Sequence, residues 1–467
     1  MGPDTGTFDT PQARQMTLRQ LLSLFGARGV STLYVKALAA NDNSKNQIYL
    51  AGHLTQLSQL PTGAVTGTNS TSQKQISAGR GVIFTSAFPI VWIDAQGAPH
   101  PAPYAKLIYY PQYPEVRFSG FLRGSTVSAG HWMNPAKAGR ATGRWLLLGV
   151  GTDKQVYTYL VTPDSTLSAE LHNHEHTQGD EVLHTLLTKA APPIQSNRDT
   201  LIHTLRDIHQ RGWIVGQKLD KHGQPLSYKA RNGGGYTLEA LLGVQPNGIA
   251  EPDFLGYEVK QFGVTRFPLT GAKPTTLLTP EPDGGYYVRN GFESFIRQYG
   301  YADKSGKPNR LNFGGRHLYG KRNSNTCLML AIQGYDETTD RITDANGAVA
   351  LLDSTSQVAA SWSFAKLLEH WKTKHALAVY IPCLRRTNSD NTYSYHYGAD
   401  IEIGTGTEFV HLLSALASEC VYFDPGMKLE NIIDTNPVSK RRSQFRINHK
   451  HLEVLYHEYE KLNIDTL

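Results

Sequence analysis

The residues best suited to chemistry are two carboxylates and a lysine near the middle of the chain. Asp253 is followed, after a short turn, by Glu258-Val259-Lys260. Because side chains alternate along a strand, Glu258 and Lys260 should share one face while Val259 points into the core. We expect Asp253 on the preceding strand. Two carboxylates and the Val259 main-chain carbonyl form an all-oxygen ligand set that suits Mg²⁺. Such an ion would acidify water and neutralise charge on a scissile phosphate, while Lys260 could hold the attacking hydroxide or a phosphoryl oxygen.

The chain just upstream strengthens this interpretation. Alone, two acids and a lysine at this spacing more often form a solvated face of a strand. Here a Gly-rich turn, 233–235, opens an expected helix that carries a further acid, Glu239. Asn247 and Pro252 frame the turn that leads to Asp253. The sequence therefore predicts a phosphodiester hydrolase, with a further acid near the two carboxylates and the lysine.

Two regions of different texture must position these residues. The first region is residues 1–165, in which residues 17–165 show short β-rich segments separated by Gly, Pro, Ser and Asn, typical of a barrel or sandwich. Residues 166–197 are polar and rich in His, and we interpret them as a linker with a short helix around Glu181–Lys189. From residue 198 to 467, helical and strand patterns alternate, which indicates a mixed α/β domain.

The expected elements can be given by residue range. In the first region we expect a leading helix at Thr17–Phe25 and strands at Leu33–Lys36, Gln47–Ala51, Gly81–Phe84, Ile90–Ile93, Leu107–Tyr110, Arg144–Val150 and Gln155–Val161. In the last region we expect helices at Arg198–Arg211, Tyr236–Leu242, Ser361–Lys374 and Gly406–Glu419, and strands at Gly212–Val215 and Ala376–Ile381. His172, His174 and His176 alternate in the linker, but no fourth ligand completes a metal site, so a solvated linker is favoured.

Composition excludes several classes of protein. No run approaches the ~18 apolar residues of a membrane helix, and the N-terminus lacks a secretion signal. The three cysteines are far apart, which argues against a disulfide framework. We therefore expect a soluble intracellular protein. Residues 1–165 hold 14 Lys+Arg against 7 Asp+Glu, whereas the rest is close to neutral. That surplus predicts a polyanion partner, with a merely basic soluble domain as the alternative.

The catalytic segment resembles a known family. The resemblance is carried by Arg231-Asn-Gly-Gly-Gly-Tyr-Thr-Leu-Glu-Ala-Leu-Leu-Gly243, Asn247, Pro252-Asp253, Gly256-Tyr-Glu-Val-Lys260, Gly212-Trp-Ile, Phe423-Asp-Pro-Gly426 and Arg442-Ser-Gln-Phe-Arg446-Ile. It is similar to MvaI/BcnI-type restriction endonucleases, which are PD-(D/E)xK nucleases related to the repair nickase MutH, over about residues 198–460. The resemblance implies that Asp253 and Glu258 hold the metal, that Lys260 is the catalytic lysine and that Glu239 is an auxiliary acid. It also implies a general base toward the C-terminus, for which His449 and His451 are options.

A site-specific nuclease also needs side chains that read bases. The basic run 439–446 offers guanidinium groups for guanine and an amide for adenine, or else simply neutralises phosphates. The candidates in this region are Arg441, Arg442, Gln444 and Arg446. A Gly-rich segment upstream offers Arg316, Lys321 and Arg322 as phosphate clamps or as an ordinary polar loop.

The N-terminal region has a resemblance of its own. Leu33-Tyr-Val-Lys-Ala-Leu-Ala-Ala-Asn-Asp42, Gln47-Ile-Tyr-Leu and Ala105-Lys-Leu-Ile-Tyr-Tyr110 resemble the EcoRII N-terminal effector domain, an all-β pseudobarrel that grips the major groove between two loop arms. The resemblance implies DNA contacts from the first arm by Lys45, Asn46 and Gln47. From the second arm it implies contacts by Gln112, Tyr113, Glu115, Arg117 and Arg123. An effector domain fused to an MvaI-like nuclease resembles the architecture of UbaLAI-like enzymes.

Together these features predict a multidomain protein, with an N-terminal all-β pseudobarrel and a C-terminal α/β PD-(D/E)xK nuclease domain. We expect a Mg²⁺-dependent, effector-assisted type II restriction endonuclease in a bacterial cytoplasm, with no membrane partner. It would act as a monomer that binds one double-stranded DNA site per domain, nicks the strands sequentially at a GC-rich CCNGG-type site, and has a cognate DNA methyltransferase in the same host. The alternatives are a MutH-like strand-specific repair nickase, a nuclease that requires methylated bases, and a catalytically idle DNA-binding regulator.

Overall fold

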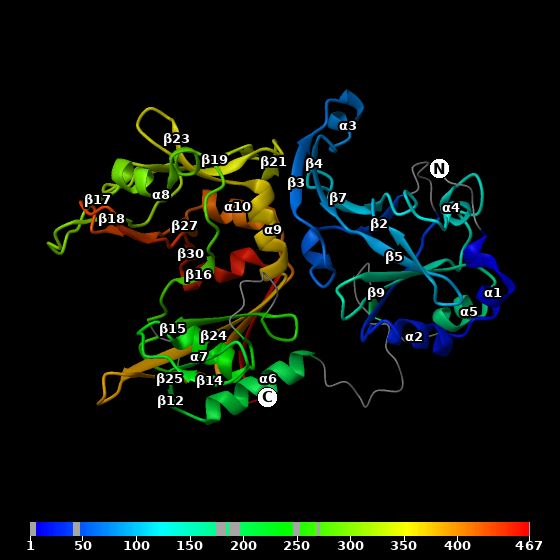
Figure 1. Ribbon diagram of the computed structural model, residues 1–467, viewed down its shortest axis with the longest axis horizontal. Helices are drawn as coiled ribbons and strands as arrows, with labels where there is room; N and C mark the ends of the chain where they lie inside the picture. The colour runs from blue at the N-terminus through cyan, green and yellow to red at the C-terminus, as the bar shows by residue number, and fades with distance from the viewer. Residues whose placement is uncertain are drawn as a thin grey trace. The chain divides into compact units, whose positions relative to one another are not determined.

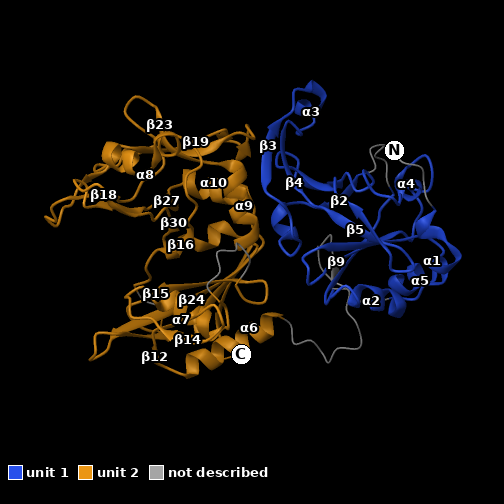
Figure 2. Ribbon diagram, viewed as in Figure 1, with its two compact units in different colours: residues 1–192 blue, residues 193–467 orange. Residues whose placement is uncertain are grey.

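The chain divides into two compact units, Met1–Pro192 and Pro193–Leu467 (Figure 2). The computed structural model describes residues 6–40, 47–173, 184–185, 197–245, 253–268 and 271–466. Among these described residues, no helix is both long and apolar enough to cross a membrane. The boundary between the units falls inside the expected linker, most of which lies outside the described residues.

Unit 1 is built mainly from two β-sheets. One has the order β11-β1-β9-β10-β5-β6, with β10 and β5 parallel, and the other has the order β2-β8-β7-β4-β3. Its strands are β1 (Leu33–Ala37), β2 (Ile48–Ala51), β3 (Val65–Asn69), β4 (Val82–Ala87), β5 (Ile90–Ile93), β6 (Pro99–Ala102), β7 (Lys106–Tyr110), β8 (Glu115–Ser119), β9 (Trp145–Val150), β10 (Val156–Val161) and β11 (His184–Thr185). Its helices are η1 (Thr7–Asp9), α1 (Pro11–Gln15), α2 (Leu18–Gly26), η2 (Leu54–Leu57), α3 (Gln73–Ser77), α4 (Gly130–Met133) and α5 (Thr166–His172).

Each of the seven strands expected in this region overlaps an observed strand, and the leading helix is α2. The α2 helix begins after Thr17, whose side chain forms a capping box with Gln20, and it buries Leu21 and Phe25 against the first sheet. Two expectations for the linker are wrong. Residues 166–172 form α5, which packs into the unit 1 core through buried leucines. Where we expected a helix around 181–189, residues 184–185 form strand β11, which pairs with β1. The sheet orders alone do not define a pseudobarrel, so that description stays a prediction.

Unit 2 is organised around a sheet of order β12-β25-β24-β26-β31, to which β15 adds by pairing in parallel with β24. The strands of this sheet are β12 (Ile214–Val215), β15 (Glu258–Gly263), β24 (Leu377–Thr387), β25 (Tyr393–Tyr397), β26 (Asp400–Thr405) and β31 (Glu458–Asn463). Helices α6 (Asn197–Gln210) and α7 (Gly234–Leu241) pack on it and bury Leu205 and Leu238 against Val259 and Ile381 (Figure 1).

The rest of unit 2 consists of smaller sheets and further helices. Their strands are β13 (Gln217–Leu219), β14 (Pro225–Ser227), β16 (Thr275–Leu278), β17 (Tyr301–Ala302), β18 (Arg310–Gly314), β19 (Met329–Gln333), β20 (Tyr335–Asp336), β21 (Arg341–Ile342), β22 (Ala348–Leu352), β23 (Val358–Ser363), β27 (Val421–Phe423), β28 (Gly426–Glu430), β29 (Val438–Lys440) and β30 (Phe445–Ile447). The helices are α8 (Tyr286–Tyr299), α9 (Phe364–Lys374), α10 (Phe409–Ala417) and η3 (His449–Leu455).

The expected C-terminal helices and strands are present with shifted ends. The helix expected from Ser361 starts at Phe364, because 358–363 form β23 and Ser363 caps the helix by accepting a hydrogen bond from the Lys366 amide. This boundary matters for the site, because α9 ends at Lys374 and β24 starts three residues later.

Candidate active site

Strand β15 carries Glu258 and Lys260 on one face, as strand alternation predicts. The Lys260 Nζ atom donates to Glu258 Oε1 at 2.8 Å, while Val259 between them is buried. Asp253 lies in a bend and not on a strand as we expected. The turn that follows it is closed by a single β-bridge between Phe254 and Tyr257. Its Oδ2 atom accepts from the Val259 amide at 2.9 Å, which holds the carboxylate beside the start of β15.

Glu239 reaches the same place from helix α7, and two tyrosines of β25 anchor the start of that helix. Tyr395 Oη accepts from the Gly233 amide at 2.9 Å, and Tyr397 Oη donates to the Gly234 carbonyl at 2.7 Å. A Cβ atom at Gly234 would lie 3.2 Å from the Gln261 side chain of β15, so a glycine permits the close approach of helix and strand.

A second lysine, which the sequence reasoning missed, faces the carboxylates. Lys374 Nζ lies 3.5 Å from Glu258 Oε1. The next residue, His375, is fully buried, stacks on Trp371 at 4.2 Å between ring centroids and contacts the Leu277 carbonyl at 3.2 Å. These contacts fix the end of α9 and with it the position of Lys374. Since Lys374 is 114 residues beyond Lys260, no local spacing pointed to it.

The carboxylates of Glu239, Asp253 and Glu258 therefore lie close together in a partly buried space, and this environment shifts their pKa values. Burial, together with the Asp253 and Glu258 carboxylates, raises the pKa of Glu239. Burial and the Glu258 carboxylate likewise raise the pKa of Asp253. Burial alone would raise the pKa of Glu258, but the ammonium groups of Lys260 and Lys374 outweigh it and hold that pKa below its usual value. A divalent cation would relieve the repulsion between these groups.

The donor set fits a divalent metal ion. Glu258 Oε2 is buried without a hydrogen-bond partner, and an orphaned carboxylate oxygen of this kind is costly unless a cation or water binds it. With Asp253 and Glu239 alongside, the ligands are hard oxygens of the sort that Mg²⁺ takes.

The carboxylates open into a cleft of about 910 Å³ with a strongly basic wall. Among the residues that the structure describes, the acids in its lining are Glu239 and Glu258, and His370 of α9 adds an imidazole whose pKa is lowered by burial. The basic residues in the lining are Arg231, Lys260, Lys273, Lys374, Arg385, Arg442 and Arg446. A long polyanion is the ligand that such a distribution of charge attracts.

The expected DNA contacts of the basic run divide into two groups. Arg442 and Arg446 line the cleft, and Arg446 is oriented by Asp424 at 2.8 Å. Arg441 is exposed and stacks its guanidinium over Phe292 at 4.9 Å. Gln444, by contrast, is buried and donates to the Asp424 carbonyl at 2.7 Å, so its amide supports the fold instead of facing a groove.

The three basic residues of the Gly-rich segment also differ in how exposed and how firmly paired they are. Arg316 is exposed and lies over the Tyr422 ring at 4.9 Å. Tyr422 is on β27, which pairs with β30, the strand that carries Arg446. Lys321 forms an ion pair with Glu419 at 2.6 Å. Arg322 donates to two main-chain carbonyls at 3.0 and 3.1 Å, which is a structural role.

Neither histidine considered as a general base lines the cleft. His449 pairs with Glu402 at 3.2 Å and packs against Phe262, at 3.9 Å between centroids. His451 lies in the same short helix, η3. The histidine in the cleft lining is instead His370 of α9.

In unit 1, Lys45 and Asn46 lie outside the described residues. Arg117 donates to both oxygens of Glu115, at 2.6 and 2.9 Å, and to Gln47 Oε1 at 3.0 Å. Glu115 is buried, and this pairing occupies the carboxylate that we expected to contact a base.

The outer residues of the second arm are more accessible. Tyr113 is half exposed beneath the guanidinium of Arg80, at 4.5 Å, and Gln112 precedes it, half buried. Arg123 is exposed and lies over the Tyr104 ring at 4.8 Å. Tyr113 and Arg123 are therefore accessible to a ligand from solvent.

Comparison with known proteins agrees with the chemistry of the cleft. Residues 202–456, more than half of the chain, match the MvaI/BcnI restriction endonuclease family. The protein is therefore a type II restriction endonuclease, an enzyme that hydrolyses DNA at specific sequences. The chain belongs to the MvaI/BcnI restriction endonuclease family. The resemblance predicted for this region is confirmed, whereas the EcoRII-like nature of unit 1 stays a prediction.

Two solved structures are similar to part of the chain. Restriction endonuclease MvaI in complex with its cognate DNA is 18% identical with a TM-score of 0.43, over 58% of this chain and 99% of that one. MvaI in the absence of DNA is 15% identical with a TM-score of 0.30, over 59% and 100% of the two chains. No curated protein matches the sequence.

Proposed function

We propose that unit 2 cleaves DNA with Mg²⁺ held by Asp253, Glu258 and the Val259 carbonyl, with Glu239 as an auxiliary acid. The observation that carries this proposal is the clustering of carboxylates in a cleft that seven basic side chains line. The basic wall binds the phosphate backbone, and Glu239 and Glu258 bring negative charge to one place along it. When bound, Mg²⁺ supplies positive charge at the scissile phosphate and makes water more acidic.

The chain's own residues orient the reacting groups. Lys260 and Lys374 balance the charge of Glu258 and present ammonium groups to a phosphoryl oxygen or the attacking hydroxide. Burial lowers the pKa of His370, which favours the neutral imidazole, the form that can accept a proton from water at the cleft wall. Arg442 and Arg446 contact the DNA as it lies in the cleft.

The test is cleavage of plasmid DNA by an Asp253→Ala variant. We expect loss of Mg²⁺-dependent cleavage with retained DNA binding measured in Ca²⁺, because the basic wall is intact. Glu458→Ala, an exposed carboxylate on β31 outside the cleft lining, is the matched control and should cleave normally. Cleavage by Asp253→Ala at the wild-type rate would remove Asp253 from the site.

We also propose that unit 1 is an effector domain that binds a second copy of the recognition sequence. Its charge surplus and the exposed Tyr113 and Arg123 support this role. A monomer with one catalytic cleft would then cut the two strands in sequential nicks, and the family resemblance favours a CCNGG-type site. A methyltransferase of the same bacterial host would protect that site.

The effector role is tested in the full chain with plasmids that carry one or two sites. The wild type should cleave the two-site plasmid faster, and a Tyr113→Ala, Arg123→Ala variant should lose that preference while keeping its one-site rate. Equal rates of the wild type on both plasmids would refute an effector role. Nicks confined to one strand would favour the repair-nickase alternative, and cleavage only of methylated DNA would favour a modification-dependent nuclease.

A further inference from the structure

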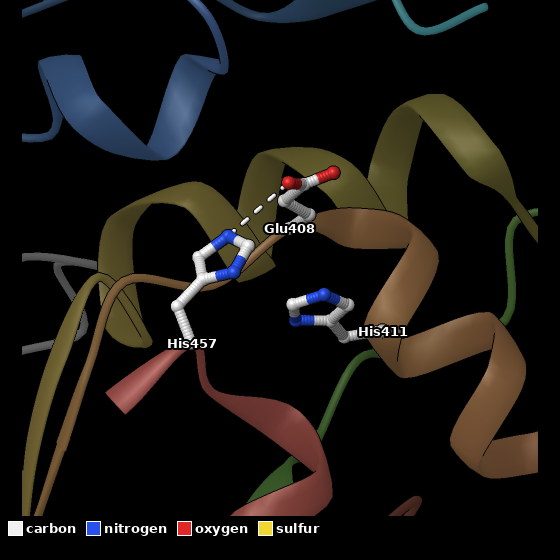
Figure 3. A group of neighbouring side chains, drawn as sticks. All are labelled: Glu408, His411 and His457. Carbon is white, nitrogen blue, oxygen red and sulfur yellow. Dashed lines mark ion pairs between the residues drawn. The ribbon is translucent and has the colours of Figure 1, made fainter. Parts of the chain in front are cut away.

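A second group of metal-ligating side chains lies in unit 2 apart from the active-site cleft. Glu408, His411 and His457 each place a ligand atom within 4.8 Å of the others, and none of them lines the cleft. Figure 3 shows the three side chains pointing toward one another.

The backbone around the cluster is already fixed. Glu408 is the N-cap residue of α10 and His411 lies three positions later, so helical geometry sets them on the same face. That helix is anchored by its other face, which buries Phe409 and Leu413. His457 immediately precedes β31, and its amide donates to the Gly406 carbonyl at 2.8 Å.

The hydrogen bonds of the two imidazoles also suit metal binding. His411 Nδ1 lies 3.2 Å from the Leu455 carbonyl, so Nδ1 carries the proton and Nε2 keeps the lone pair. A metal-ligating histidine commonly has such a carbonyl partner on its other nitrogen. His457 Nε2 is 3.1 Å from Glu408 Oε1, a little less than the ~3.4 Å between two ligands of a tetrahedral ion with bonds of ~2.1 Å.

We propose that Glu408, His411 and His457 form a second metal site, specific for Zn²⁺ or a similar transition-metal dication. Two imidazoles and a carboxylate leave the fourth position to water, and the His457 side chain is half exposed, so the ion has access from solvent. The site joins the start of α10 to the segment that enters the edge strand β31. It is distinct in chemistry from the all-oxygen catalytic cluster, which favours Mg²⁺.

The experiment is calorimetric titration of the tag-free full chain with Zn²⁺ in excess Mg²⁺, which occupies oxygen ligands but competes poorly for imidazole. We expect one Zn²⁺ per chain. His411→Ala and His457→Ala should each weaken binding by more than the ~10–100-fold that loss of an outer-shell partner costs. His222→Ala, an exposed histidine in the β13–β14 turn, is the matched control and should bind as the wild type does.

Glu408→Gln guards against misfolding, because it keeps the shape of the side chain and removes its charge. It should weaken Zn²⁺ binding while plasmid cleavage in Mg²⁺ continues at the wild-type rate. Absence of Zn²⁺ binding by the wild type, or unchanged affinity in both His411→Ala and Glu408→Gln, would overturn the proposal. Failure of the active-site proposal would leave this result unaffected, because the readout is binding and not cleavage.

Discussion

Replacement of Lys374 by methionine tests how the second lysine acts. Lys260 and Lys374 lie 2.8 and 3.5 Å from Glu258 Oε1. At an effective dielectric constant of about 20, Coulomb's law gives about 6 and about 5 kcal/mol of attraction, both upper bounds. Solvent screens Lys374 more, because its side chain is 28% exposed against 13% for Lys260. We therefore expect a net loss of about 1.5 kcal/mol in Lys374→Met, which is roughly tenfold in rate, and about 100-fold or more in Lys260→Met.

The assay is single-turnover cleavage of a supercoiled plasmid at saturating protein, measured across pH. Loss of either ammonium group raises the pKa of Glu258, so the carboxylate is protonated at a higher pH and the acid limb of the rate profile moves upward in pH. Lys307→Met, an exposed lysine outside the cleft lining, is the control. A wild-type rate with an unmoved acid limb in Lys374→Met would refute the reasoning.

Two further predictions concern stability. Burial lowers the pKa of His317 from 6.5 to about 4, so below pH 6.5 the unfolded chain binds a proton that the folded chain does not. Stability should fall as the pH drops through that window, by about 2 kcal/mol between about pH 7 and about pH 5, and His317→Gln should show a smaller loss in urea unfolding. Arg144 is buried and donates to three main-chain carbonyls, each at 2.7 Å. Arg144→Met should destabilise unit 1 by about 4 kcal/mol, whereas the exposed Lys137→Met should have little effect on the urea midpoint; equal midpoints for the two would contradict the role of Arg144.

The sequence predicted those parts of the site that depend on local geometry. Glu258 and Lys260 share a face because strand alternation acts over two residues, and the helix with Glu239 follows a recognisable glycine turn. Lys374 and His370 could not be found in this way, since their approach depends on the parallel pairing of β15 with β24. Spacing alone does not reveal such a long-range register.

The DNA-contact predictions were limited because the exposure of a side chain also depends on long-range packing, which local spacing does not reveal. Arg446 and Gln444 stand two residues apart in one basic run, yet one lines the cleft and the other is buried against the Asp424 carbonyl. Glu115 likewise reads as a polar arm residue in the sequence, but the burial of its ion pair with Arg117 depends on neighbouring strands.

The basic lining of the cleft has a consequence for how the enzyme searches DNA. Each phosphate that a cation neutralises releases counterions, so seven such contacts would give a slope of about −6 in a plot of log affinity against log salt concentration. A fourfold rise in salt would then weaken binding roughly 10³–10⁴-fold, whatever the sequence. Dilute salt therefore favours long one-dimensional sliding along the duplex, and concentrated salt favours brief encounters in which base contacts decide whether the enzyme stays.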